Sequence, residues 1–151
     1  MKMLRIIIVA GLAILIISFT AAASPLQLLS LQEASLDDEP VRMVAPKASP
    51  MATGPAIKVI QPDFSKEVRS PLNLDVRFVP QDGRKVDLET LKVECLKIIT
   101  IDLTDRIRPF AKANGISVKD VDLPSGKHKI RISIADTQGG ISQETIVLKV
   151  P

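Results

Sequence analysis

The sequence has few of the side chains that carry out chemistry at protein sites. Its 151 residues include no tryptophan, no tyrosine, one histidine, one cysteine and four phenylalanines. A single cysteine cannot form an internal disulfide, so a folded domain must be held by a packed core. Only Phe64, Phe78 and Phe110 lie beyond residue 23, which nearly rules out aromatic platforms for sugars or unstacked bases.

Catalytic and phosphate-binding motifs are also missing. The chain has no glycine-rich phosphate loop and no HExxH, GxSxG or CxxC pattern. One histidine and one cysteine cannot complete a closed zinc site without several carboxylates. We therefore expect a protein that is not an enzyme and that uses no cofactor.

The one long apolar run lies at the N-terminus. Residues 1–23 combine a basic start, MKMLR, an apolar stretch, IIIVAGLAILII, and small residues, which is the layout of a secretory signal peptide. Ala21-Ala22-Ala23 predicts cleavage after Ala23. An uncleaved anchor is the alternative, because the 18 residues from Ile6 to Ala23 reach the lower limit for spanning a bilayer. Both alternatives place the rest of the chain outside the cytoplasm, in the periplasm or secreted.

The charge pattern does not suggest a nucleic-acid-binding surface. The chain carries 20 basic and 17 acidic residues, but Lys2 and Arg5 belong to residues 1–23, and 18 basic residues then face 17 acidic ones. The surplus cations are scattered singly, which is typical of a solvated surface rather than of a phosphate-binding stripe.

Residues 24–54 are predicted to form a flexible linker. Pro40, Pro46, Pro50 and an acidic DDE run interrupt short apolar pieces, and no period lasts long enough to bury a face. A brief amphipathic helix over QLLSLQEASL is the alternative for part of this segment.

Residues 55–151 are predicted to form one β-sandwich domain. Apolar residues recur at every second position, as in strands with one buried face. No long helical period separates the strands, which excludes a parallel α/β arrangement. The alternation of inward-facing residues shifts by one position between Val118 and Val121, which predicts a bulge. The stretch DRIRPFAK predicts a short helical turn. The seven expected strands lie near residues 56–60, 72–79, 91–95, 98–104, 116–123, 130–135 and 146–150.

The only histidine lies in LPSGKHKIRISIADTQGG, residues 123–140. In immunoglobulin-type sandwiches the sixth strand begins at a corner where a polar aromatic side chain bonds back to the upstream main chain. Gly126, His128 and Ile130 have the spacing of that corner. We therefore predict that His128 bonds a main-chain carbonyl and is neither a catalytic base nor a metal ligand.

These features resemble the bacterial immunoglobulin-like or fibronectin III-like modules of exported proteins. The matching residues are Leu123-Pro124-x-Gly126-x-His128, the alternating isoleucines, Asp136-x-x-Gly139, Pro62 and Ser70-Pro71-Leu72-x-Leu74-x-Val76. The resemblance covers about residues 56–150 and lacks the disulfide and core tryptophan of antibody-like domains. It implies an immunoglobulin-like sandwich of about seven antiparallel strands, with structural roles for Gly126, His128, Ile130, Asp136 and Gly139.

Aspartates are the only candidates for a metal site. Oxygen ligands gathered at one end of the sandwich would bind calcium, although no D-x-D-x-D-G loop is present. Asp136 is better explained as an acceptor for amides of its own turn. The weak calcium candidates are Asp102, Asp105, Asp120, Asp122 and Asp136.

Two further residues have structural interpretations. Asp105 is predicted to cap the helical turn, the alternative being that Arg106 or Arg108 reaches an acidic partner. Cys95 is predicted to face inward and to behave as a small apolar residue.

The expected function is that of an exported, non-catalytic module acting through protein–protein contacts in the cell envelope. Recognition is expected along an exposed edge strand, either the first strand or the strand over residues 98–104. One alternative is a structural envelope module held in the membrane by an uncleaved N-terminal segment. Another is a calcium-dependent adhesion or matrix module.

Overall fold

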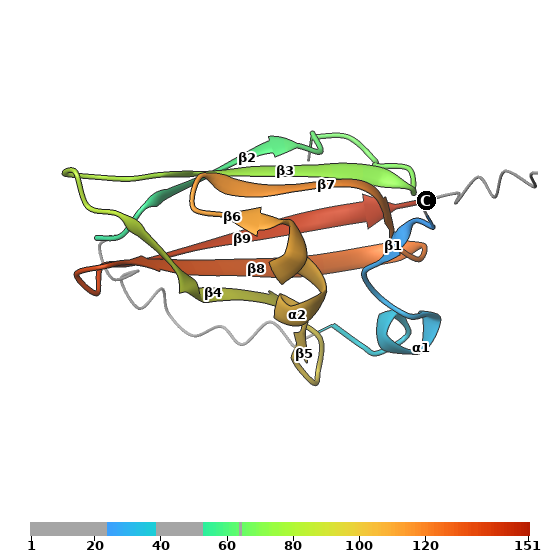
Figure 1. Ribbon diagram of the computed structural model, residues 1–151. Coiled ribbons are helices and arrows are strands. Elements are labelled where there is room, and N and C mark those ends of the chain that lie inside the picture. Colours follow the sequence, from blue (N-terminus) through green and yellow to red (C-terminus); the bar gives the residue numbers. More distant parts are fainter. Residues whose placement is uncertain (1–23, 39–52, 64) are drawn as a thin grey trace, which may run out of the picture.

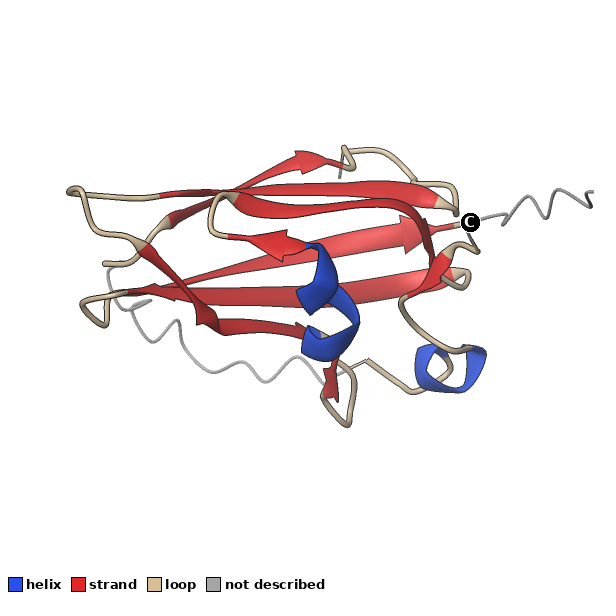
Figure 2. Ribbon diagram, viewed as in Figure 1, coloured by secondary structure: helices blue, strands red, loops and turns tan. Residues whose placement is uncertain are grey.

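The chain forms two β-sheets that face one another, which confirms the all-β class predicted from the sequence. The computed structural model describes residues 24–38, 53–63 and 65–151, so the predicted signal peptide or anchor lies outside the described residues. Figure 1 shows the two layers along their strands, and Figure 2 shows how little helix accompanies them. None of the described helices is long and apolar enough to cross a membrane.

The first sheet has the order β1, β7, β3, β2, with β6 also paired to β7, and the second has the order β5, β4, β8, β9. All paired strands are antiparallel except β1 and β7. The first sheet comprises Leu26–Gln27 (β1), Ala56–Gln61 (β2), Leu72–Val79 (β3), Ala111–Lys112 (β6) and Gly115–Asp122 (β7). The second comprises Val86–Cys95 (β4), Ile101–Asp102 (β5), Gly126–Asp136 (β8) and Ile141–Val150 (β9). The helices are Leu31–Ala34 (α1), Thr104–Ile107 (α2) and the 3-10 turn Arg108–Phe110 (η1).

Alternating side chains build the core between the sheets. Every second residue of β3 is buried, and β8 buries its isoleucines in the same way. Cys95 lies in this core as a free thiol, as predicted. Burial raises the pKa of the Cys95 thiol, which keeps it protonated and unreactive.

Strand β7 carries the predicted bulge. Its pairing with β3 shifts between Leu72 and Leu74, and Asp120 takes a left-handed conformation with φ of 54°. The extra residue allows Val121 to return to the buried face after Val118.

Two predictions near residue 100 are wrong in part. The strand expected over residues 98–104 is reduced to β5, because the Asp102 carboxylate accepts a hydrogen bond from the Thr104 N–H at 2.8 Å and turns the chain into α2. Asp105 does not cap α2, whose N-cap residue is Leu103. Arg106 instead reaches an acidic partner, the alternative considered for this turn.

Residues 24–38, here called the N-terminal segment, belong to the folded domain. β1 pairs in parallel with the end of β7, and Leu28 and Leu29 are 1% and 0% exposed within the core. The flexible linker predicted from residue 24 is therefore wrong for this part, because two adjacent leucines enter the core without any regular period. The alternative helix forms only as α1, which buries no residue.

Charged side chains fasten the rest of the N-terminal segment. Ser30 and Glu33 form a capping box on α1. Arg106 donates to both oxygens of Glu33, at 3.0 and 2.8 Å, and to the Leu28 carbonyl at 2.6 Å. Lys97, only 5% exposed, donates to Asp38 at 2.8 Å. The segment is thus held by apolar burial, strand pairing and ion pairs together.

The Glu33–Arg106 pair predicts a loss of stability in acid. Hydrogen bonds from Arg106 and from the Ser30 main chain lower the pKa of Glu33 from 4.5 to about 2. Because folding favours the charged carboxylate, its stabilisation is complete above pH 4.5 and is lost as the pH falls toward 2.

The free energy of unfolding should therefore fall less in acid for Glu33→Gln than for the original protein. The expected difference is about 1 to 2 kcal/mol, a figure that allows for solvent screening of the pair. Urea unfolding of both proteins at neutral pH and at about pH 3 measures the difference. An acid dependence as steep in Glu33→Gln as in the original protein would contradict the assignment.

Candidate binding surface

His128 forms the corner that its spacing predicts. The side chain is 0% exposed, and Nε2 lies 2.8 Å from the Pro124 carbonyl oxygen. Gly126 begins β8 with a φ of 131°, and Ile130 follows in the core. His128 thus holds the start of β8 to the upstream main chain from within the core.

Asp136 organises the turn between β8 and β9. Its Oδ1 accepts hydrogen bonds from the Gln138 and Gly140 N–H groups, each at 2.8 Å, and Arg84 donates to Oδ2 at 3.0 Å. The Gly140 N–H is the largest cause of the lowered pKa of Asp136. Gly139 completes the turn with a φ of 84°, so the role predicted for Asp136 is confirmed.

The five candidate calcium ligands do not form a cluster. Across residues 24–38, 53–63 and 65–151, no group of three or more His, Cys, Asp or Glu side chains is placed to hold a metal ion. Asp102 turns the chain into α2, Asp120 lies in the bulge, and Asp105 is exposed on α2. Asp122 accepts a hydrogen bond from the Ser70 hydroxyl at 2.6 Å.

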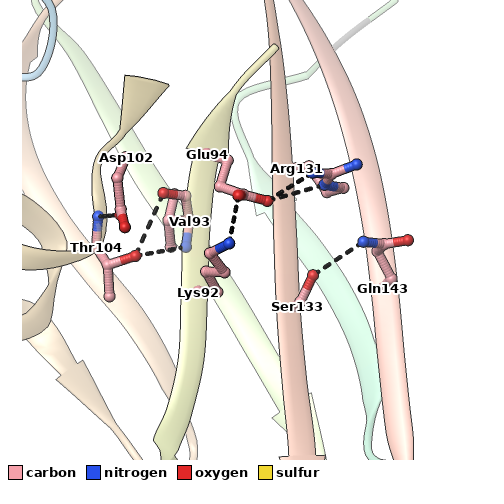
Figure 3. Close-up of polar contacts among 8 residues, drawn as sticks. All are labelled: Lys92, Val93, Glu94, Asp102, Thr104, Arg131, Ser133 and Gln143. Atoms are coloured by element: carbon pink, nitrogen blue, oxygen red, sulfur yellow. Dashed lines mark hydrogen bonds and ion pairs between the residues drawn. The ribbon is translucent and has the colours of Figure 1, made fainter. Parts of the chain in front are cut away.

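Three charged side chains on the outer face of the second sheet satisfy one another. Glu94 accepts two hydrogen bonds from Arg131, at 3.0 and 2.7 Å, and pairs with Lys92 at 2.6 Å (Figure 3). Thr104 of α2 forms hydrogen bonds with the main chain of Val93 in β4, which fixes α2 against β4 (Figure 3). This part of the surface is therefore a closed polar network that holds β4, β8 and α2 in register.

The free edge of the first sheet is β2, as predicted for the first strand. The Phe78 N–H of β3 donates to Asn114, at the β7 side. Main-chain groups of successive strand residues point in alternate directions, so Arg77 and Val79 of β3 face β2. Within the described part of the chain, no strand pairs with the opposite side of β2.

The outward main-chain groups of β2 follow from this register. Arg77 and Val79 pair with Lys58 and Ala56, so the main-chain groups of the intervening residues, Ile57 and Val59, face away from β3. The side chains of Ile57 and Val59 pack against the core. Their N–H and C=O groups are thus held in place at an open edge.

The second predicted edge is shorter. β5 ends the second sheet, but it has only two residues. Ile98 and Ile99 in the preceding loop are 61% and 66% exposed. β2 therefore offers a longer run of main chain to a partner than β5 does.

A groove of about 870 Å³ lies on the first sheet over β3 and the start of β7. Asp75, Arg77 and Val79 alternate with buried residues of β3, so the groove lies on the outer face of the sheet. Gly115 is required there, because a Cβ would collide with the Val76 carbonyl oxygen and φ is 147°. The lining is Asp75–Val79 and Asn114–Ser117, with Pro109, Phe110 and Lys112.

Comparisons with known proteins identify no family. No protein-family model and no curated protein matches the chain. Among solved structures, the chain is similar to a crystal structure described as an engineered protein, with 15% sequence identity and a TM-score of 0.43. The match covers 66% of this chain and 21% of that chain, so this chain spans about a fifth of its length. We base no argument on that similarity.

Proposed function

We propose that this protein is an exported, non-catalytic immunoglobulin-like module that binds an extended segment of another envelope protein along β2. The observation that carries the proposal is the open edge of β2, where the main-chain groups of Ile57 and Val59 face outward. An added strand gains affinity from main-chain hydrogen bonds and specificity from alternate side chains. The buried His128 and the scattered aspartates support a non-catalytic role.

The strand order supports the immunoglobulin-like part of the proposal. In such sandwiches the first, second and fifth strands share one sheet, and the third, sixth and seventh share the other. Omitting the two-residue strands β1 and β6, the first group corresponds to β2, β3 and β7 and the second to β4, β8 and β9. The fourth strand, β5, joins the second sheet, which differs from the constant-type arrangement.

A membrane-held structural module is the second candidate, and the position of β1 favours it. Only Ser24 and Pro25 separate Ala23 from β1 at Leu26. If residues 1–23 stay in the bilayer, the domain is held close to the membrane. Mass spectrometry of the purified protein separates the two candidates, because a mature N-terminus at Ser24 rules out the anchor.

The edge proposal predicts a difference between two substitutions at Val59. Val59→Pro removes the outward N–H, while Val59→Ala truncates the side chain and keeps that donor. We expect Val59→Pro to weaken partner binding about tenfold or more, from lost hydrogen bonds and a blocked approach. Val59→Ala is expected to bind within about threefold of the original protein.

A photo-crosslinking residue in place of the exposed Ile60 identifies the partner segment for this measurement. Circular dichroism of both Val59 variants verifies that the sheet is intact. Equal binding by Val59→Pro and Val59→Ala would refute recognition along β2.

A further inference from the structure

A row of cations crosses the outer face of the first sheet. Lys58 lies opposite Arg77, Arg77 opposite Gly115, and Gly115 opposite Lys112. Directly opposite residues of antiparallel strands point to the same face, so the three cations share one surface, with Gly115 between Arg77 and Lys112. Neighbouring strands are about 4.8 Å apart, which makes the row about 14 Å long.

The charges in this row are not neutralised locally. Across the described ranges, none of the three cations forms an ion pair, whereas Arg106 and Arg131 each meet a carboxylate within 3.0 Å. Like charges placed directly opposite on a sheet, as in Lys58 and Arg77, repel and destabilise the pair. Bringing an anion to this face would relieve that repulsion.

The groove beside the row combines charge with apolar surface. Val79 and Phe110 are each 38% exposed and line it together with Pro109. Asp75 is its one acidic lining residue and Arg77 and Lys112 are its two basic ones, so the lining carries a net charge of +1, to which the neighbouring Lys58 of β2 adds a further cation. A single aromatic ring does not provide the stacking platform that a nucleic acid needs, and the lining instead matches an acidic peptide.

We propose that this groove binds an acidic, extended segment of a partner protein. The inference rests on the protein-binding part of the proposed function, not on the edge of β2, and names the chemistry of the partner. The segment lies over β3 and the start of β7 for about five residues, or about 17 Å. One carboxylate meets the Arg77 guanidinium through paired hydrogen bonds, and a second meets Lys112. An apolar side chain between them contacts Val79 and Phe110.

The test uses protein purified after expression of the full chain and fluorescent peptides of about ten residues. The probes alternate valine with glutamate, with glutamine or with lysine. We expect only the glutamate peptide to bind, and its affinity to fall as salt rises from about 0.05 to 0.5 M. The double variant Arg77→Glu/Lys112→Glu is expected to weaken this binding about tenfold or more.

The matched control is Lys127→Glu/Lys149→Glu. These lysines are an opposed pair on the outer face of the second sheet, so reversing them changes the net charge equally away from the groove. Binding that persists in this control supports the groove. A control that loses as much affinity as Arg77→Glu/Lys112→Glu, or a glutamine peptide that binds as tightly as the glutamate peptide, would overturn it. Tighter binding of a single-stranded oligonucleotide of equal charge would also overturn it.

Failure of the groove and failure of the edge give different results. If Val59→Pro abolishes binding of the photo-crosslinked partner while Arg77→Glu/Lys112→Glu leaves it intact, the edge proposal stands and the acidic-segment inference is wrong. If the charge reversal abolishes binding and Val59→Pro does not, the groove stands and the edge proposal is wrong.

Discussion

Leu29→Ala is expected to lower the free energy of unfolding by about 3 to 4 kcal/mol. Leu29 is 0% exposed and lies in the core cluster beside Leu28, so truncation loses buried apolar surface and leaves a cavity. An effect of this size is a large fraction of the total stability of a small domain. Urea denaturation followed by circular dichroism measures it.

Leu31→Ala is the matched control in the same segment. Leu31 is 77% exposed on α1, where alanine also favours the helix, so the change is expected to stay within about 0.5 kcal/mol. If Leu29→Ala were as mild as Leu31→Ala, residues 24–38 would not contribute to the core, and the linker predicted from the sequence would stand.

The burial of Leu28 and Leu29 has a consequence for export. Cleavage after Ala23 would leave Ser24 and Pro25 ahead of β1, so a mature chain keeps the whole N-terminal segment. A chain starting after residue 38 would lose both leucines and leave the buried Lys97 without the carboxylate of Asp38. Such a chain loses the buried apolar surface of the two leucines and also the carboxylate that neutralises the buried Lys97.

The strands were predictable because their signal is local. A period of two needs only one strand and one buried face, and β2, β3 and β9 each show it within a few residues. The corner at His128 and the turn at Asp136 were also predictable, since their bonds span four residues or fewer. For the same reason the bulge could be placed in β7.

The N-terminal segment was not predictable in this way, because its contacts are distant in sequence. Arg106 bonds the Leu28 carbonyl across 78 positions, and Lys97 bonds Asp38 across 59. β1 has only two residues, too few for any period. One local signal was present, the capping-box sequence Ser30-x-x-Glu33, which marks the start of α1.

The cation row was hidden for a different reason. Lys58, Arg77 and Lys112 lie on separate strands, and each looks like an ordinary solvated residue within its own stretch. Only the register between strands brings them to one face. Sequence spacing alone therefore predicts a solvated surface where the fold places a charged groove.

His128→Ala is expected to lower the free energy of unfolding by about 3 kcal/mol. The change removes a fully buried ring, and it also removes the hydrogen-bond partner of the Pro124 carbonyl. Binding of the β2 partner by the folded fraction is expected to stay unchanged, because the ring lies in the core rather than on the binding surface. Urea unfolding and the partner-binding measurement are made on the same samples.

His128→Phe separates ring volume from hydrogen bonding. Phenylalanine fills the site but loses the bond to Pro124, while it removes Nδ1, a buried atom without a hydrogen-bond partner in the described structure. These two changes have opposite effects on stability. His128→Phe is therefore expected to lower the free energy of unfolding by only about 1 kcal/mol. A stable His128→Ala protein that had lost partner binding would contradict the structural role and point to recognition by the imidazole itself.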